Sequence, residues 1–150
     1  MKARLAVILL PVLVLLAAFR SDPVPSSAPV LRVVKSPTCG CCQAWVDYMK
    51  AQGFTVTVEN RESFTQLKRD NGVTAELESC HTAFVDGLVV EGHVPADLFK
   101  KLLRDKPAGV KGVAVPGMPR GSPGMDAPVH DRYTVYTFDA TGRKTAYAQR

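Results

Sequence analysis

The order of the elements predicted along the chain, β-α-β-α-β-β-α, indicates an α/β domain of thioredoxin-like topology. Two observations support this fold class. Cys39 and Cys42 have CxxC spacing and fall between the first expected strand and the first expected helix. The chain has 150 residues, which favours a single domain. We therefore expect one folded domain over residues 30–150, in which a Gly/Pro-rich loop and a C-terminal β-hairpin follow the thioredoxin-like unit.

The first half of that domain alternates between strand and helix patterns. Residues 31–34 form a β-branched run typical of a buried strand, and a helix whose first turn holds the cysteines is expected to stop at Gly53. Residues 54–58 alternate in the manner of a strand. Residues 63–66 have the form of a capping box and predict a second helix that ends before Gly72.

The next elements are a predicted hairpin and a third helix. Asp86-Gly87 is a two-residue turn signal between strand-like residues 82–86 and 88–92. Pro95 fits the first position of a helix that runs to about residue 104. The apolar face of this helix is expected to consist of Leu98, Phe99, Leu102 and Leu103.

The last part of the chain predicts a loop and a hairpin. Residues 107–128 are rich in Gly and Pro and predict a long loop, a feature that is usually functional in a compact domain. Residues 133–138 and 144–148 have strand character, with a turn at 140–142 between them.

The first twenty residues have the pattern of an export signal. Lys2 and Arg4 give a positive start, and residues 5–18 form an apolar run that is short for a membrane span. We expect residues 1–20 to be a signal peptide, with an uncleaved N-terminal anchor as the alternative, and residues 21–29 to be a Pro/Ser-rich linker. Export predicts a periplasmic protein that meets the membrane only if the N-terminal segment stays uncleaved.

The charge balance argues against one class of partner. The formal net charge is +5, and without Lys2, Arg4, Arg20 and Asp22 it falls to +3. Such a weak and scattered excess does not predict nucleic-acid binding.

The cysteines carry the most specific chemical signal. Three of the four lie in Cys39-Gly40-Cys41-Cys42, and the fourth is Cys80. Structural disulfides are usual after export, but links within this cluster would close only tiny loops and gain little entropy. A predicted helix N-terminus favours the thiolate form of these cysteines. Three neighbouring thiolates repel one another unless a cation neutralises them, so the cluster predicts a thiophilic metal site.

Further soft donors occur at predicted element ends and in loops. Methionine thioethers bind Cu(I) without deprotonation and do not form disulfides, which favours copper in an oxidising compartment. We therefore predict copper, as Cu(I), and bridging thiolates would allow more than one ion. The candidate metal ligands are Cys39, Cys41, Cys42, Cys80, His81, His93, Met118 and Met125.

Several of these candidates have a structural alternative. Cys80 can bridge to the cluster or pack as a small buried side chain, and His81 can be its exposed neighbour. His93 can cap the turn that follows it, and Met118 and Met125 can fill gaps under a loop. For His130, the adjacent Asp131 is a candidate to orient the ring.

Four motifs occur in order within residues 31–148. They are Pro37-Thr38-Cys39-Gly40-Cys41-Cys42 with Trp45, Ser79-Cys80-His81-Thr82-Ala83, Glu91-Gly92-His93-Val94-Pro95, and Val115-Pro116-Gly117-Met118-Pro119 with Gly121-Ser122-Pro123-Gly124-Met125. In these motifs the chain resembles a family of periplasmic metal-binding proteins formerly classed as domain of unknown function 411, which includes the CopG-type copper-resistance proteins. The resemblance implies a thioredoxin-like domain, copper binding through the cysteine cluster and nearby soft ligands, and a role in copper tolerance.

The expected function is copper sequestration, with copper ions and other periplasmic copper-handling proteins as partners. An enzyme is the main alternative, either a thiol-disulfide oxidoreductase or a copper reductase that cycles Cys39 and Cys42. Thioredoxin-type oxidoreductases usually have a cis-proline where this chain has Cys80-His81-Thr82. A structural zinc site of three cysteines and one histidine fits less well, because tetrahedral zinc leaves the methionines unused.

Overall fold

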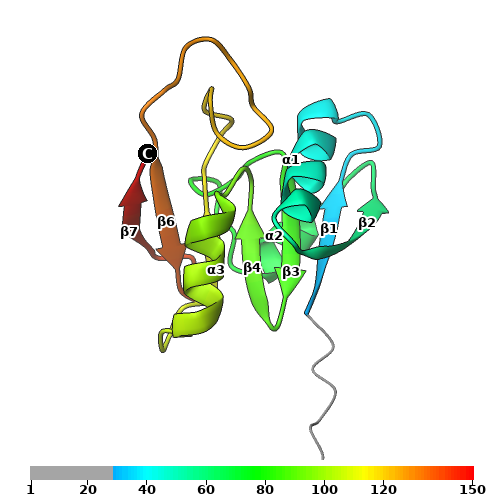
Figure 1. Cartoon of the computed structure of the whole chain (residues 1–150). Helices are drawn as coiled ribbons and strands as arrows, with labels where there is room; N and C mark the ends of the chain where they lie inside the picture. Colours follow the sequence, from blue (N-terminus) through cyan, green and yellow to red (C-terminus); the bar gives the residue numbers. More distant parts are fainter. Residues whose placement is uncertain (1–28) are drawn as a thin grey trace, which may run out of the picture.

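The computed structural model describes residues 29–150. Within them, one seven-stranded sheet carries three helices (Figure 1). The elements are β1 Val30–Lys35, α1 Gly40–Ala51, β2 Thr55–Asn60, α2 Thr65–Asp70, β3 His81–Val85, β4 Leu88–Glu91, α3 Ala96–Asp105, β5 Gly112–Ala114, β6 Thr134–Phe138 and β7 Lys144–Gln149. The predicted order β-α-β-α-β-β-α is therefore observed from β1 to α3, and the predicted C-terminal hairpin is observed as β6 and β7.

The strands lie in the order β2-β1-β3-β4-β5-β6-β7. β1 and β2 are parallel, β3 runs antiparallel to β1 and β4, and β5 is parallel to β4. β5, β6 and β7 are antiparallel neighbours, with a register shift between Val135 and Tyr136. β5 thus joins the C-terminal hairpin to the edge of the first four strands and makes one continuous sheet.

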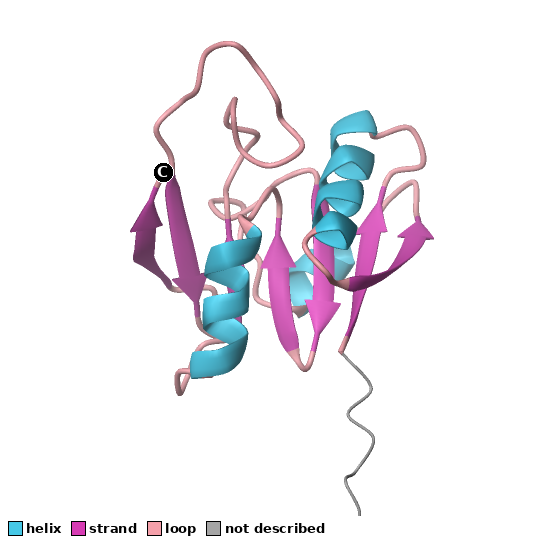
Figure 2. Cartoon of the chain, viewed as in Figure 1, coloured by secondary structure: helices cyan, strands magenta, loops and turns pink. Residues whose placement is uncertain are grey.

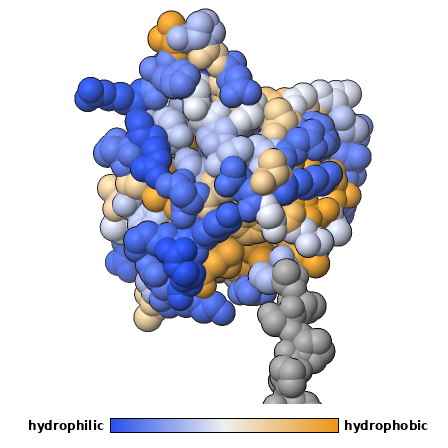
Figure 3. Space-filling view, viewed as in Figure 1, coloured by the Kyte–Doolittle hydropathy of each residue, from blue (hydrophilic) through white to orange (hydrophobic). Residues whose placement is uncertain are grey.

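Helices cover both faces of the sheet (Figure 2). α1 and α3 lie on one face and α2 lies on the other. Alternate strand residues therefore enter two different cores: Val90 and Val113 pack on the side of Trp45 and Phe99, whereas Val89 belongs to the opposite cluster. On the face that carries α1 and α3, hydrophilic residues cover most of the surface and apolar residues form separate patches (Figure 3).

Local signals explain the best predicted elements. The Cys39 side chain caps α1 by accepting a hydrogen bond from the Cys42 N–H at 3.3 Å. Asp86 and Gly87 both have positive φ, +48° and +77°, as a two-residue hairpin turn requires. These local conformations fix where α1 begins and how β3 and β4 pair.

Three predicted details are wrong. The capping box at 63–66 is absent, because Phe64 precedes the first residue of α2 and no side chain caps the helix. Pro95 has ψ 135° and caps α3 from outside instead of being its first residue. The loop predicted over 107–128 contains β5, a strand stabilised by pairing with β4 and β6 on its two sides.

The predicted signal peptide at 1–20 and almost all of the linker at 21–29 lie outside the described residues. Over residues 29–150, the helices are all too short or too polar to span a bilayer.

Candidate metal centre

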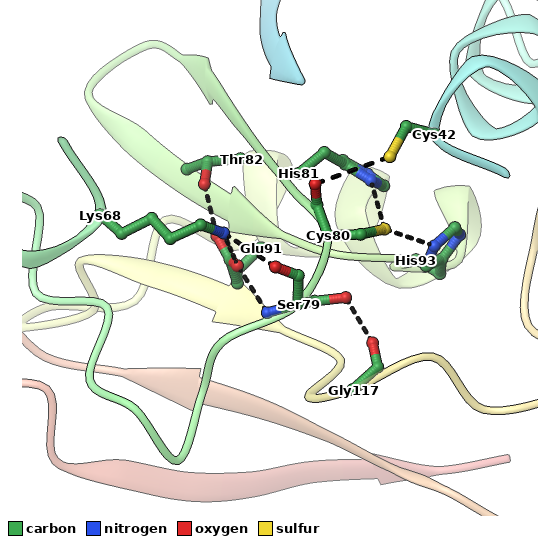
Figure 4. A network of polar contacts seen from close by, with 9 residues as sticks. All are labelled: Cys42, Lys68, Ser79, Cys80, His81, Thr82, Glu91, His93 and Gly117. Atoms are coloured by element: carbon green, nitrogen blue, oxygen red, sulfur yellow. Dashed lines mark hydrogen bonds and ion pairs between the residues drawn. The ribbon is translucent and has the colours of Figure 1, made fainter. Parts of the chain in front are cut away.

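Three segments meet at one end of the sheet and carry the cysteines and two histidines. The first is the N-terminus of α1, which follows β1. The second is the residue before β3, Cys80, and the third is the turn between β4 and α3, which holds His93. Figure 4 shows the side chains of Cys42, Cys80, His81 and His93 gathered at this point.

The four cysteine sulfurs form one group in which all atoms lie within 4.8 Å of one another. Cys39 and Cys42 are joined by a disulfide, and Cys41 and Cys80 are free. Cys41 Sγ lies 3.5 Å from Cys39 Sγ and 4.0 Å from Cys80 Sγ. The structure therefore does not show the alternative bridge from Cys80 to the cluster, and two of the three clustered cysteines are oxidised. Reduction of this one disulfide would give four free cysteine side chains.

His93 faces Cys80 in the orientation of a ligand. Its Nε2 lies 3.0 Å from Cys80 Sγ, and its Nδ1 lies 2.9 Å from the carbonyl oxygen of Pro123. Because a carbonyl oxygen only accepts, Nδ1 carries the proton and Nε2 presents a lone pair in the neutral ring. A backbone carbonyl that orients the distal nitrogen in this way is the usual partner of a metal-binding histidine.

His81 is fully buried, so its predicted alternative as an exposed neighbour of Cys80 is wrong. Its ring lies 4.4 Å from the Trp45 ring and 5.0 Å from the His93 ring, between centroids. Nδ1 lies 3.4 Å from Cys80 Sγ, whereas the buried Nε2 has no hydrogen-bond partner. The ring is therefore held by packing, with one nitrogen directed at Cys80.

Burial sets the charge of the three groups around Cys80. It lowers the pKa of His93 and, more strongly, the pKa of His81, so both rings stay neutral as metal ligands must. Burial also raises the pKa of the Cys80 thiol to about 12, with the neighbouring Cys41 as the second cause. Without a cation Cys80 thus keeps its proton, and a bound soft metal would displace it.

The two methionines predicted as ligands, Met118 and Met125, lie in the loop after β5. Met118 is 54% exposed, and Met125 is half-buried. The loop reaches the centre through the two residues before Met125. The Pro123 carbonyl accepts the hydrogen bond from His93, and a Cβ on Gly124 would lie 2.6 Å from the backbone nitrogen of Trp45. The structure therefore brings this loop to the centre at Pro123 and Gly124.

His130 is exposed and packs over Gly121. Asp131, a candidate to orient the His130 ring, instead pairs through its carboxylate with Arg120, at 2.6 Å to Nη2 and 3.1 Å to Nε. This pair links two segments of the loop between β5 and β6.

The buried ion pair of Lys68 and Glu91, which lies beside Ser79 and Cys80, is absent from the sequence predictions (Figure 4). The available signal is Glu91 itself, a carboxylate that ends the otherwise apolar strand β4. Its partner on α2 has no local signal.

Comparisons with known proteins agree with this geometry. The family described as "Protein of unknown function, DUF411" matches residues 77–125. Two solved structures of a copper resistance protein copG are similar over 81% of this chain at 38% identity. Form 2 is covered over 98% of its length with a TM-score of 0.76, and form 1 over 96% with a TM-score of 0.75. No curated protein sequence matches the chain. On the strength of this identity and coverage, the chain belongs to the CopG-type copper-resistance family.

Proposed function

We propose that this protein sequesters copper as Cu(I) in the periplasm and thereby contributes to copper tolerance. The observation that carries the proposal is the convergence of four cysteine sulfurs and two neutral imidazoles on one end of the sheet. Thiolate and imidazole are donors that suit copper, and thiolate in particular selects its cuprous form. The name of the two similar structures, copper resistance protein, supports the same metal.

Cys80 is shared between two groups of donors. One consists of Cys39, Cys41, Cys42 and Cys80, and the other of Cys80, His81 and His93. Within each group all donor atoms lie within 4.8 Å of one another. A thiolate can bridge two cuprous ions, so the shared position of Cys80 supports a centre with more than one copper. Met118 and Met125 are proposed as outer ligands, supplied by the loop that reaches the centre at Pro123 and Gly124.

We also infer that β1 to α3 form a thioredoxin-like unit. The strand order β2-β1-β3-β4, with parallel β1 and β2 and antiparallel β3 and β4, supports this assignment. So does the position of the CxxC segment, which follows β1 and forms the N-cap and first turn of α1. The export pattern of residues 1–20 supports a periplasmic location. Residues 30–150 are proposed to form the folded, metal-binding domain.

An enzyme that cycles Cys39 and Cys42 is the second candidate, and the Cys39–Cys42 disulfide favours it. Two variants separate the candidates, because a dithiol exchanger needs Cys39 and Cys42 but not Cys41. Cys41→Ser should spare insulin reduction or Cu(II) reduction by an enzyme, yet weaken copper binding by a cluster. Cys42→Ser should abolish the reduction and weaken copper binding.

The direct test is metal analysis of protein that is reduced, loaded with copper and purified without oxygen. Copper content gives the number of ions, and copper K-edge spectroscopy gives the valence and the sulfur ligands. We expect Cu(I) with mainly sulfur neighbours. Protein that retains no copper after loading, or that retains zinc in its place, would overturn the proposal.

A further inference from the structure

The backbone just before Cys80 is held by an ion pair on the opposite face of the sheet. Side chains alternate along β3, so that His81 packs against Trp45 of α1 whereas Thr82 points to the α2 side. On that side Lys68 of α2 and Glu91 of β4 form an ion pair with side chains only 7% and 0% exposed. The pair is therefore separate from the donors around Cys80 (Figure 4).

Two further hydrogen bonds join this ion pair to the backbone of Ser79. Glu91 Oε1 accepts the Ser79 N–H at 2.7 Å, and Lys68 Nζ donates to the Ser79 carbonyl at 3.0 Å. Glu91 Oε2 accepts the Thr82 hydroxyl at 2.6 Å. Both backbone polar groups of the residue before Cys80 are thus satisfied by one buried ion pair.

Ser79 is also fixed through its side chain. Its hydroxyl donates to the carbonyl of Gly117, and the Gly117 N–H donates to the Glu78 carbonyl at 2.9 Å. Gly92 passes so close that a Cβ there would lie 2.4 Å from Ser79 Oγ. The backbone at Ser79 therefore has little room to move, and this restricts the position of the Cys80 sulfur.

We propose that Lys68 and Glu91 are positioning residues for copper binding, which hold the Ser79 backbone so that Cys80 reaches both donor groups. The inference rests on the proposed copper function. A buried ion pair is weak evidence of a stabilising role, because the loss of hydration offsets the attraction of the charges. Metal sites, in contrast, require ligand distances within about 0.2 Å. Hydrogen bonds between the ion pair and both the N–H and the carbonyl of Ser79 hold the backbone next to Cys80 and can provide this precision.

The test uses a double variant, Lys68→Met with Glu91→Gln, in the full chain. Either single change leaves a buried group without its partner, whereas the double change removes both charges together and is expected to fold. It loses the donor to the Ser79 carbonyl and loosens the segment. The matched control is Lys101→Met with Asp105→Asn, which removes an ion pair on α3. Thermal unfolding establishes that each variant is folded before copper is added.

Cu(I) affinity is measured by competition with a chromogenic cuprous chelator after reduction of the protein. We expect the double variant to bind Cu(I) about 10- to 100-fold more weakly than the wild type, the usual cost of removing groups that orient ligands. Copper absorption spectroscopy should show fewer or more spread copper–sulfur distances. The α3 control should match the wild type in both measurements.

A cycle with Cys80→Ser distinguishes positioning from a general structural effect. If the ion pair acts through Cys80, its removal should have almost no further effect on affinity once Cys80 is serine. An equal fold-loss in both backgrounds, or an unchanged affinity in the folded double variant, would overturn the inference. If the double variant does not fold, fast amide hydrogen exchange at Ser79 and Cys80 in the wild type would overturn it, and slow exchange would support it. A wild type that binds no Cu(I) would instead overturn the proposed function.

Discussion

The two halves of the sheet use polar side chains in different ways. From β1 to α3, the described residues include five buried ionisable side chains: Lys35, Lys68, His81, Glu91 and His93. From β5 to the C-terminus, the ion pairs lie at the surface, as between Arg120 and Asp131 or Arg143 and Asp139. Burial of an ionisable group is unfavourable unless a partner compensates for lost water. The buried ionisable side chains thus lie in the same half as the cysteine and histidine donors, and β5 to β7 extend the sheet beside it.

The largest effect is expected at Cys80, because it belongs to both donor groups. Cys80→Ser should lower Cu(I) affinity by more than about 100-fold, beyond the usual effect of residues that only orient ligands. Cys41→Ser should have a smaller effect, since it leaves Cys80, His81 and His93 in place. Copper stoichiometry and chelator competition measure both variants. Equal losses in the two variants would contradict the shared role of Cys80.

Removal of one member of the buried ion pair should lower the free energy of unfolding more than removal of one member of an exposed pair. Lys68→Met leaves the Glu91 carboxylate buried without its cation, and we expect a loss of about 3–5 kcal/mol in the free energy of unfolding. Lys101→Met removes one member of an exposed pair on α3 and should change stability little. Urea denaturation compares the two. A Lys68→Met variant as stable as the Lys101→Met variant would show that polar groups in the two environments contribute alike.

The loop that joins β5 to β6 links the two halves at Gly124. This residue has φ +80°, and an added Cβ would lie 2.6 Å from the backbone nitrogen of Trp45 and 2.9 Å from the Cys41 carbonyl oxygen. Gly124→Ala should therefore cost about 1–3 kcal/mol in stability. It should also speed Cu(I) release, since Pro123 orients His93. Stopped-flow transfer to a chelator measures the release.

Gly109→Ala is the matched control for this substitution. Gly109 has φ +78°, but a Cβ added at this position would meet no atom within 4 Å. The variant tests the cost of the backbone conformation alone and should leave Cu(I) release unchanged. If Gly124→Ala releases copper no faster than Gly109→Ala, the loop does not retain the metal.

The sequence predicts features that depend on near neighbours. The helix that contains Cys41 and Cys42 begins where Cys39 can cap it, and the Asp86-Gly87 turn follows from the positive φ that these residues tolerate. Cys80 and His93 are also predicted as soft donors, and the structure brings Cys80 to the cysteine cluster and His93 to Cys80. In each case the signal lies within a few residues, or in the chemistry of the side chains themselves.

Features that depend on packing were not predictable. β5 has only three residues and exists because β4 and β6 both pair with it. The ion pair of Lys68 and Glu91 joins residues 23 positions apart. No local pattern predicts which face of α2 packs on the sheet, or that the end of β4 is buried. The complete burial of His81 depends in the same way on Trp45, which comes from another element.

The smallest effect is expected at Asp139, in the turn between β6 and β7. The hydrogen bond from the Thr141 hydroxyl, with further bonds from Thr141 and Arg143, lowers the pKa of Asp139 from 3.8 to about 2. A carboxylate with a lowered pKa stabilises the folded state above its unfolded pKa, and this contribution is lost as the pH falls from about 4 to about 2. Asp139→Asn should therefore lower the Tm slightly at pH 7, and the difference from the wild type should shrink over that acidic range. Because the carboxylate is partly exposed and screened by solvent, the change should be smaller than that of Gly124→Ala and should leave Cu(I) affinity unaltered. A change in copper affinity would mean that the C-terminal hairpin is coupled to the metal centre, and the division between the two halves would then have to be abandoned.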